Sequence, residues 1–355
     1  MTAPTFGKES SAIMKAVILA GGRGTRLQGV THGAIPKPMA ELLGRPILEH
    51  IIRLLAQNGF TDICCTLAWM PEAVRSYFGD GSRFGVRLRY SVEETPLGTA
   101  GAVKNCRDFF GRSPFLVISG DAACDFDLRA LWEEHRRRRG AVTMALHAHD
   151  APLPYGLVVT DARDRVHRFI EKPRWGRVVT DLVNTGIYCI EPGVMDMVPE
   201  NTPCDFARDL FPRLLRAGYP LVGISAPGYW RDIGDPGSYY RANLDAWEGR
   251  LHLPAGGMPP LTPPETETPQ PERIRSRYAC RLYCPTERRA RLMRELTAGL
   301  MEAGADFSDG LTLGKVPGGV HIAPCADREA LFIESDSPDT ARKFEALAKA
   351  LRERI

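Results

Sequence analysis

The 355-residue sequence contains no apolar run close to the roughly 20 residues that a membrane-spanning helix needs, and its first residues, MTAPTFGKESSAIMK, lack the continuous apolar core of a secretion signal. It also lacks a surplus of one charge, since 46 Lys and Arg stand against 43 Asp and Glu, a formal net charge of +3. The one basic run, Arg136 to Arg139, follows an amphipathic pattern and is typical of a solvated helix end. We therefore expect a cytoplasmic protein that binds neither a membrane nor nucleic acid.

Paired cysteine motifs are missing as well. The nine cysteines are an odd number without any Cys-x-x-Cys pair, and nothing in the sequence indicates an oxidising compartment. Cys280 and Cys284 have no second Cys or His pair at a useful spacing, which argues against a zinc site. The sequence predicts reduced, mostly buried thiols.

The patterned part of the chain begins with an apolar, β-branched run at residues 15–20, KAVILA, which predicts a strand buried on both faces. A glycine-rich loop and a helical pattern from Ile47 to Gln57 follow. Further apolar runs alternate with helical patterns: strands are expected at 63–68, 115–119 and 142–146, and helices at 72–78, 101–109 and 128–139. This alternation predicts an α/β fold with a largely parallel sheet.

The composition changes after Gly249. Residues 251–273 carry seven prolines and almost no large apolar side chains, which predicts an extended linker. Residues 274–355 contain helical patterns at 286–303 and 338–354 around strands at 319–323 and 330–334, as in a small α+β domain. We thus expect a disordered tail over 1–13, a large domain over 14–250, the linker, and the C-terminal domain.

The loop after the first strand, Gly21-Gly22-Arg23-Gly24-Thr25-Arg26, suits the close approach of backbone N–H groups to phosphate. It is neither a dinucleotide-binding fingerprint, because Leu27 occupies the last glycine position, nor a P-loop, because no Gly-Lys-Ser or Gly-Lys-Thr follows. Downstream, Lys37 is held between Pro36 and Pro38. Fixed cations beside a glycine loop suit a triphosphate.

Motifs in one order along the chain resemble the sugar-1-phosphate nucleotidyltransferase family. They are LAGGRGTRL (19–27), IPKPM (35–39), LGTAGAV (97–103), SGD (119–121), FIEKP (169–173), NTGIY (184–188) and YWRDIGDPGSYYRANLD (229–245). Within the family, the sequence is most similar to bacterial mannose-1-phosphate guanylyltransferases. The resemblance implies a Rossmann-like catalytic domain with a mixed, mostly parallel sheet over 14–250. It also implies Mg²⁺-dependent transfer of a nucleotidyl group from a nucleoside triphosphate to a sugar 1-phosphate, with GTP and mannose 1-phosphate giving GDP-mannose and pyrophosphate.

The resemblance also assigns roles to residues. It makes Arg26, Lys37, Asp121 and Lys172 catalytic, and Asp121 and Asp232 the ligands of Mg²⁺. The groups that would surround the nucleotide are Ala20, Gly21, Gly22, Gly24, Thr25, Gly98 and Thr99. The sugar phosphate would be bound by Gly156, Glu171, Lys172 and Asn184. Asp127 is interpreted instead as the cap of the helix that begins at Leu128.

The sequence departs from the family in two places. Gln28-Gly29 and the four residues from His32 to Ile35 differ from the usual loop, so a different loop shape is expected there. The C-terminal domain resembles the last domain of phosphohexomutases, but residues 323–328, APCADR, replace its phosphate loop, and no serine-centred phosphorylation loop is present. Mutase activity is therefore not expected, and we interpret this domain as an oligomerisation or regulatory module.

Other functions stay compatible with the sequence. A related GDP-sugar such as a GDP-heptose could be the product, or the enzyme could transfer a uridylyl or thymidylyl group to glucose 1-phosphate. A third hypothesis is a catalytically silent, regulatory sugar-nucleotide sensor. The sequence does not fix the oligomeric state, and a homo-oligomer is compatible with it.

Overall fold

The computed structural model describes residues 13–22, 24–254, 279–301, 305–306, 310–313, 320–324, 330–335 and 338–354. Most of the predicted tail and linker, residues 1–12 and 255–273, lies outside this part of the chain, as does Arg23. The chain divides into two compact units. Unit 1 comprises residues up to 137, 188–204 and 228–261, and unit 2 comprises residues 138–187, 205–227 and 262–355.

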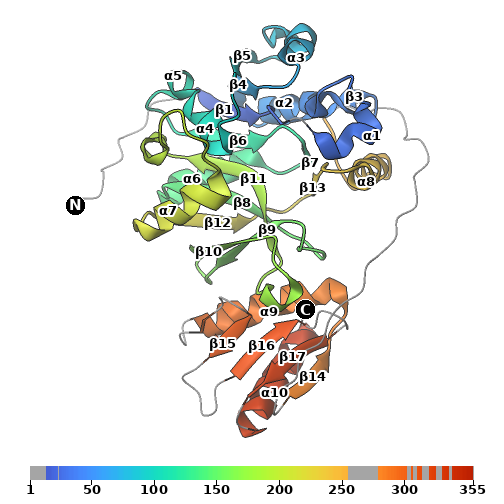
Figure 1. Cartoon of the computed structure of the whole chain (residues 1–355), viewed down its shortest axis with the longest axis vertical. Coiled ribbons are helices and arrows are strands. Elements are labelled where there is room, and N and C mark those ends of the chain that lie inside the picture. Colours follow the sequence, from blue (N-terminus) through green and yellow to red (C-terminus); the bar gives the residue numbers. More distant parts are fainter. Residues whose placement is uncertain are drawn as a thin grey trace. The chain divides into compact units, whose positions relative to one another are not determined.

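Unit 1 is built around parallel strands in the order β6-β1-β4-β5, which are Phe115–Ser119, Met14–Leu19, Phe60–Leu67 and Arg87–Val92. Val17 in the middle of β1 pairs with Cys64 on one side and Val117 on the other. These central residues are almost completely buried, as expected for a parallel strand covered on both faces. The predicted parallel α/β core is confirmed (Figure 1).

The described helices of unit 1 are α1 (Gln28–Thr31), α2 (Ile47–Gln57), α3 (Pro71–Phe78), α4 (Gly98–Lys104), α5 (Arg107–Phe110), α6 (Leu128–Arg138) and α8 (Pro236–Trp247). Of these, α2, α3 and α6 lie within one residue of the predicted ranges, while α1 and α8 were not predicted. The single helix expected over 101–109 was wrong, because α4 ends before Asn105 and α5 restarts after Cys106. Asn has a low helix propensity, and the backbone N–H of Cys106 bonds to Val103 rather than continuing the α-helical pattern.

Smaller elements complete unit 1. Its connections contain short 3₁₀ turns at Thr25–Leu27, Lys37–Met39 and Ser82–Phe84 and a longer one at Pro192–Met197. They also contain a hairpin formed by β2 (Glu41–Leu42) and β3 (Arg45–Pro46). The short strand β7 (Ala122–Cys124) pairs antiparallel with β13 (Trp230–Asp232). This pairing brings a segment near residue 232 to the end of β6.

In unit 2, β9 (Gly156–Thr160) pairs antiparallel with β10 (Val166–Glu171) and with β11 (Leu182–Ile190), while β8 (Val142–Ala148) pairs parallel with β12 (Leu221–Ser225). A 3₁₀ turn, η4 (Trp175–Arg177), lies between β10 and β11. A π-helical turn at Phe206–Leu210 leads into α7 (Phe211–Arg216). The antiparallel pairs make the sheet content mixed, as the family resemblance implied.

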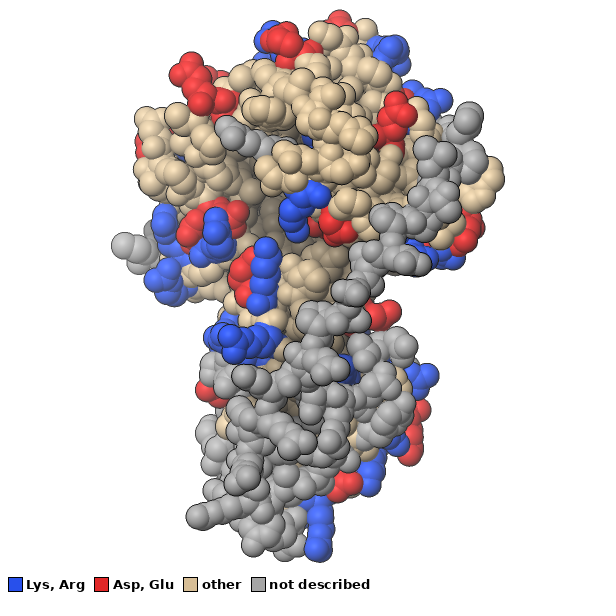
Figure 2. All heavy atoms as spheres, turned by 45° about the vertical axis from the view of Figure 1, so that its right-hand side comes forward, with Lys and Arg blue, Asp and Glu red and all other residues tan. Residues whose placement is uncertain are grey.

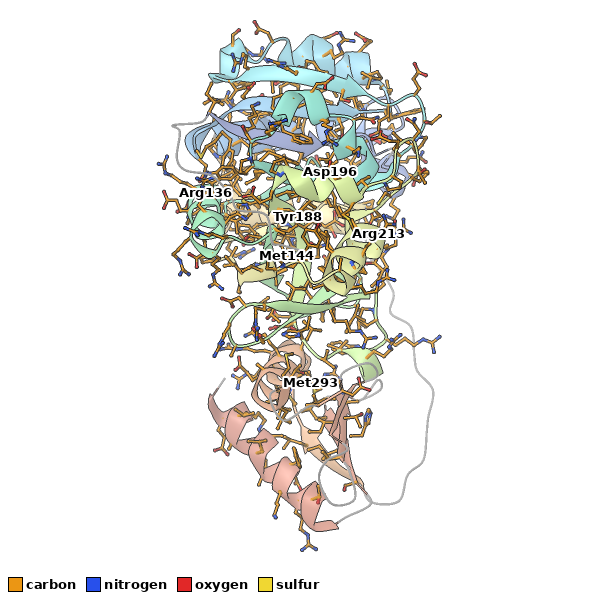
Figure 3. All side chains as sticks on the ribbon, turned by 90° about the vertical axis from the view of Figure 1, so that its left-hand side faces the viewer. Arg136, Met144, Tyr188, Asp196, Arg213 and Met293 are labelled. Atoms are coloured by element: carbon orange, nitrogen blue, oxygen red, sulfur yellow. The ribbon has the colours of Figure 1, made fainter. Side chains whose placement is uncertain are left out.

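The C-terminal domain, also in unit 2, is α+β as predicted. Its antiparallel sheet has the order β14-β17-β16-β15, formed by Ala279–Tyr283, Ala330–Glu334, Val320–Pro324 and Leu311–Leu313. Helices α9 (Thr286–Met301) and α10 (Pro338–Arg354) contact each other and the sheet. Met293 of α9 is fully buried, and so is Met144 of β8 (Figure 3).

The distribution of charged side chains and the state of the cysteines agree with the expectations from the sequence. Figure 2 shows positive and negative side chains interspersed, without a broad field of one sign on that face. Arg136 in the basic run is exposed on α6. The seven cysteines described with their side chains are buried thiols outside any disulfide, as predicted. Among the described helices, none is long and apolar enough to cross a membrane.

Candidate active site

The topology of unit 1 creates a natural place for a ligand. The chain passes from β1 to its neighbour β4 and then β5, and returns to place β6 on the other side of β1. Ligands of open α/β sheets bind outside the carboxyl ends of strands where the strand order reverses in this way. The glycine loop follows β1 and Asp121 follows β6, so both predicted features lie at this edge.

Gly21 and Gly22 follow the end of β1 after one residue, Ala20, and present backbone without side chains there. The backbone N–H of Ala20 donates to Thr66 of β4. A Cβ on Gly21 would lie 3.4 Å from the backbone nitrogen of Ala68, so Gly21 packs closely against the end of β4. At Gly22, by contrast, a Cβ would meet nothing within 4 Å. Gly22 therefore leaves open space in which a ligand can approach the backbone.

Gly24 has a different role. Its φ of +63° lies in the left-handed region, and a Cβ there would be 2.6 Å from Cβ of Lys37. Two separate requirements, conformation and space, thus demand glycine at this position. Gly24 also accepts a hydrogen bond from Leu27, which closes the turn containing Thr25 and Arg26.

Lys37 connects this loop to two carboxylates. Its side chain is enclosed, with the residue 7% exposed. Nζ donates to Oδ2 of Asp121 at 2.6 Å and lies 3.6 Å from Oδ1 of Asp232. Pro36 adopts an extended conformation and Pro38 follows within the 3₁₀ turn, which restricts the backbone on both sides of the lysine.

The two carboxylates are held by the ends of β6 and β13. The N–H of Gly120 donates to Leu19, and the N–H of Ile233 donates to the backbone oxygen of Asp121. The Ser119 hydroxyl donates to Oδ1 of Asp121 at 2.5 Å. Asp232 pairs with Ala122 in the β7–β13 ladder. Backbone pairing therefore fixes both aspartates next to the Lys37 ammonium.

The electrostatic environments of the two aspartates differ. Burial opposes ionisation of Asp121, but the charge and hydrogen bond of Lys37, together with the Ser119 hydroxyl, outweigh it and keep the pKa of Asp121 below its usual value. For Asp232, burial and the neighbouring charge of Asp121 raise the pKa, against the opposing charges of Lys37 and Arg26. Both carboxylates thus lie against the same lysine, and Asp232 also interacts with the charge of Arg26.

The donor set at this point fits a hard divalent cation. Two carboxylates, each with a side chain 32% exposed, offer oxygen ligands without enclosing a cation. Within the described residues, no group of three or more His, Cys, Asp or Glu forms a full metal cage. Mg²⁺ typically uses one or two carboxylates and completes its shell with phosphate oxygens and water.

Arg26 lies beside this cluster. The residue is exposed, and its Nη2 would be 3.2 Å from a Cβ on Gly234, which in turn would be 2.7 Å from Oδ2 of Asp232. Gly234 therefore leaves room for the guanidinium to approach the aspartate. An exposed arginine in this position can contact an anionic ligand.

Gly98 and Thr99 begin α4, and the structure gives Gly98 a packing role. Its φ is +72°, and a Cβ would lie 2.6 Å from the backbone oxygen of Cys204. The same oxygen accepts hydrogen bonds from Ala100 and Gly101. This contact alone requires glycine at position 98, and the predicted contacts of Gly98 and Thr99 with a nucleobase stay a prediction.

The predicted sugar-binding residues lie together in unit 2. Glu171 pairs with Gly156 across β10 and β9, where a Cβ on Gly156 would be 2.9 Å from Oε2 of Glu171. Lys172 follows with a φ of +39°, and its N–H donates to Tyr155. Asn184 stands in β11 directly after Val183, which pairs with Leu157. All four residues therefore gather at one end of three adjacent strands.

A family model described as nucleotidyl transferase matches residues 15–249. The chain belongs to the nucleotidyl transferase family. The matched region contains every predicted site residue and ends before the C-terminal domain.

Individual relatives are similar to this chain over the same region. The UTP–glucose-1-phosphate uridylyltransferase of Synechocystis is 38% identical over 242 residues, which are 64% of this chain and 62% of the relative. The mannose-1-phosphate guanylyltransferase of Mycobacterium tuberculosis is 36% identical over 241 residues, 68% of this chain and 66% of the relative. The chain thus spans less than two thirds of the length of these relatives. The solved structure of HddC from Yersinia pseudotuberculosis with GMP-PN is 29% identical with a TM-score of 0.58, and covers 66% of this chain and 99% of that one.

Sequence reasoning missed supporting residues around the nucleotidyl transferase site. Ser119 belongs to the SGD motif, and its position two residues before Asp121 at a strand end could have indicated a shared face. Beside Asp232, the phenolic oxygen of Tyr229 donates to Asp245 and accepts a hydrogen bond from Arg231. Arg250 completes this network on Asp245. These residues brace the strand that carries Asp232. The interpretation of Asp127 as a helix cap is confirmed by its hydrogen bond from Ala130.

Proposed function

We propose that this nucleotidyl transferase catalyses Mg²⁺-dependent transfer of a nucleotidyl group from a nucleoside triphosphate to a sugar 1-phosphate, with release of pyrophosphate. The observation that carries the proposal is the contact of Lys37 with Asp121, with Asp232 at 3.6 Å, next to the open backbone at Gly22. Cations, oxygen ligands and an unobstructed glycine backbone together suit a polyphosphate.

The reaction explains why these residue types are needed. An oxygen of the sugar phosphate attacks the α-phosphorus in line and pyrophosphate leaves, so the protein has to orient two anions and reduce their repulsion. Arg26 and Lys37 supply positive charge at the triphosphate. Lys172 binds the phosphate of the sugar, while Glu171 and Asn184 bind its hydroxyl groups. Mg²⁺ held by Asp121 and Asp232 would offset the charge on the phosphates when it is bound.

For the substrates we propose GTP and mannose 1-phosphate, which give GDP-mannose. Support comes from the names of relatives: mannose-1-phosphate guanylyl- or guanyltransferases from Mycobacterium and several yeasts share 35–37% identity with this chain. The Synechocystis relative favours a second candidate, transfer of a uridylyl group to glucose 1-phosphate.

The test is a matrix of pyrophosphate-release assays on the full chain with Mg²⁺, in which GTP, UTP, dTTP, CTP and ATP are each combined with mannose, glucose and heptose 1-phosphates. We expect the highest kcat/KM for GTP with mannose 1-phosphate. Asp121→Ala should lower turnover by roughly a hundredfold or more, because it removes a preorganised charge from the reacting phosphates. Asp108→Ala changes an exposed aspartate on α5 and serves as the matched control.

The assay also separates the alternatives. A dominant UTP–glucose 1-phosphate pair would replace the proposed substrates and keep the reaction. Silence with every pair, combined with binding of a nucleotide sugar to the folded chain, would favour the regulatory sensor.

A further inference from the structure

The segment between two predicted sugar-binding residues is covered by the C-terminal domain. Residues 173–181, here called the connecting segment, begin directly after Lys172 and end three residues before Asn184. They include the 3₁₀ turn at Trp175–Arg177 and then become buried, with Val178 and Val179 at 0% exposure. The segment therefore connects Lys172 to β11, the strand that carries Asn184.

An ion pair joins the end of the connecting segment to α9. Nη1 of Arg294 lies 2.9 Å from Oδ1 of Asp181, and the exposed fractions of the two side chains are 24% and 7%. Burial raises the pKa of the Asp181 carboxyl, and the charge of Arg294 opposes that shift. The backbone oxygen of Asp181 also accepts a hydrogen bond from His149. Arg294 is thus paired with a buried carboxylate on this segment, and the charge of Arg291 acts on that carboxylate in the same direction.

Two further contacts reach the segment from the same helix. The hydroxyl of Thr297, three residues after Arg294 and on the same helix face, donates to the backbone oxygen of Val179 at 2.8 Å. The guanidinium carbon of Arg289 lies 4.4 Å from the ring centroid of Trp175, and Arg289 is 4% exposed. A cation held over an indole away from water is a favourable contact. Helix α9 therefore contacts the segment at its start, middle and end.

The backbone at Lys172 needs such support. Its φ of +39° lies outside the regions that a residue with a side chain prefers, so the backbone is strained there. A conformation of this kind persists where its surroundings determine it. On one side Lys172 is held by the hydrogen bond from its N–H to Tyr155. On the other side its support is the connecting segment, which α9 contacts from beyond the region matched by the family model.

We infer that α9 of the C-terminal domain positions the connecting segment, and through it Lys172 and Asn184, for binding of the sugar 1-phosphate. Arg289, Arg294 and Thr297 act as positioning residues, since what they contact is the connecting segment. The inference rests on the proposed function. It gives the C-terminal domain a role in binding one of the two substrates.

The experiment measures both Michaelis constants of full-chain variants, with the substrate pair that the wild type converts best. Arg294→Ala should raise the KM for the sugar 1-phosphate about tenfold and change the KM for the nucleotide less than twofold. Arg294→Lys, which keeps the charge, should restore most of the sugar-phosphate KM. Arg288→Ala, an exposed arginine on the same helix, is the control and should match the wild type.

Thr297→Val keeps the test decisive should Arg294→Ala fail to fold, because it removes only one hydroxyl at nearly constant volume. It should raise the sugar-phosphate KM about threefold. Folded variants with an unchanged sugar-phosphate KM, or with equal increases in both Michaelis constants, would overturn the inference and leave the proposed function intact. A wild type that is inactive with every substrate pair would overturn the proposed function and this inference together.

Discussion

Replacing Lys37 by Met tests whether the lysine acts as the counter-charge of both aspartates. Met has a similar length and apolar stem, so the main change is loss of the ammonium 2.6 Å from Asp121 and 3.6 Å from Asp232. Breaking a fully buried pair costs about 3–5 kcal/mol. Because each carboxylate is 32% exposed, water can replace part of the interaction, and we expect a loss of ~1–2 kcal/mol at pH 7.

The pH dependence of this loss follows from the pKa of Asp121. Its pKa in the folded protein is below the usual value because of Lys37, so the pair stabilises the fold above the unfolded pKa and loses that effect as the pH falls through the folded pKa. In Lys37→Met the aspartates repel each other and take up protons more readily. The stability difference between wild type and variant should therefore shrink on acidification.

Thermal unfolding with and without Mg²⁺ measures these effects. At pH 7 without Mg²⁺ the variant should melt roughly 2–8 °C below the wild type, which corresponds to ~1–2 kcal/mol in a domain of this size. Mg²⁺ should raise the melting temperature of the variant more than that of the wild type, because it supplies the missing charge, while turnover stays about a hundredfold lower. Equal melting temperatures and an equal response to Mg²⁺ would refute the reasoning.

Two further predictions concern single positions. Gly24→Ala should destabilise unit 1 by about 2–4 kcal/mol, because alanine disfavours the left-handed φ and its Cβ would lie 2.6 Å from Lys37. Gly22→Ala should leave the urea unfolding midpoint within experimental error but weaken nucleotide binding. Equal unfolding midpoints for the two variants would contradict this prediction. At Asp161, partial burial opposes ionisation, but the backbone N–H groups of Arg165 and Arg163 and the side chains of His167 and Arg165 lower the pKa to about 2. Its contribution is present above about pH 4 and lost as the pH falls towards 2, so Asp161→Asn should cost about 1–2 kcal/mol in urea unfolding at pH 7 and little near pH 2.5; a cost independent of pH would count against it.

The core strands and long helices of the fold could be predicted from local patterns. The helix expected over Ile47–Gln57 has those bounds, because eight of its eleven residues are buried in a strong amphipathic pattern. The break between α4 and α5 was not predictable in this way, since apolar residues continue through it and only the hydrogen bond of Cys106 reveals it. The antiparallel strands around Gly156 depend on pairing partners distant in the sequence, which periodicity does not identify.

The candidate site shows the same limit. Lys37 and Asp121 are 84 residues apart in the sequence, and no spacing rule brings them together. What joins them is topology: β1 and β6 are neighbours in the sheet, so the loop after one meets the turn after the other. The family motifs indicated which residues meet. Only the structure shows that Lys37 contacts both aspartates, that the pKa values of the aspartates shift in opposite directions, and that the Ser119 hydroxyl donates to Asp121.

The glycines of the loop illustrate how one sequence pattern serves two physical purposes. Gly22 borders open space, so its missing side chain leaves a ligand access to the backbone. Gly24 borders Lys37, so its missing side chain lets the protein pack the lysine against the loop. A glycine-rich motif read from sequence does not separate these roles, because both glycines belong to the same loop. A side chain at position 22 should therefore reduce ligand affinity, whereas a side chain at position 24 should displace the Lys37 ammonium.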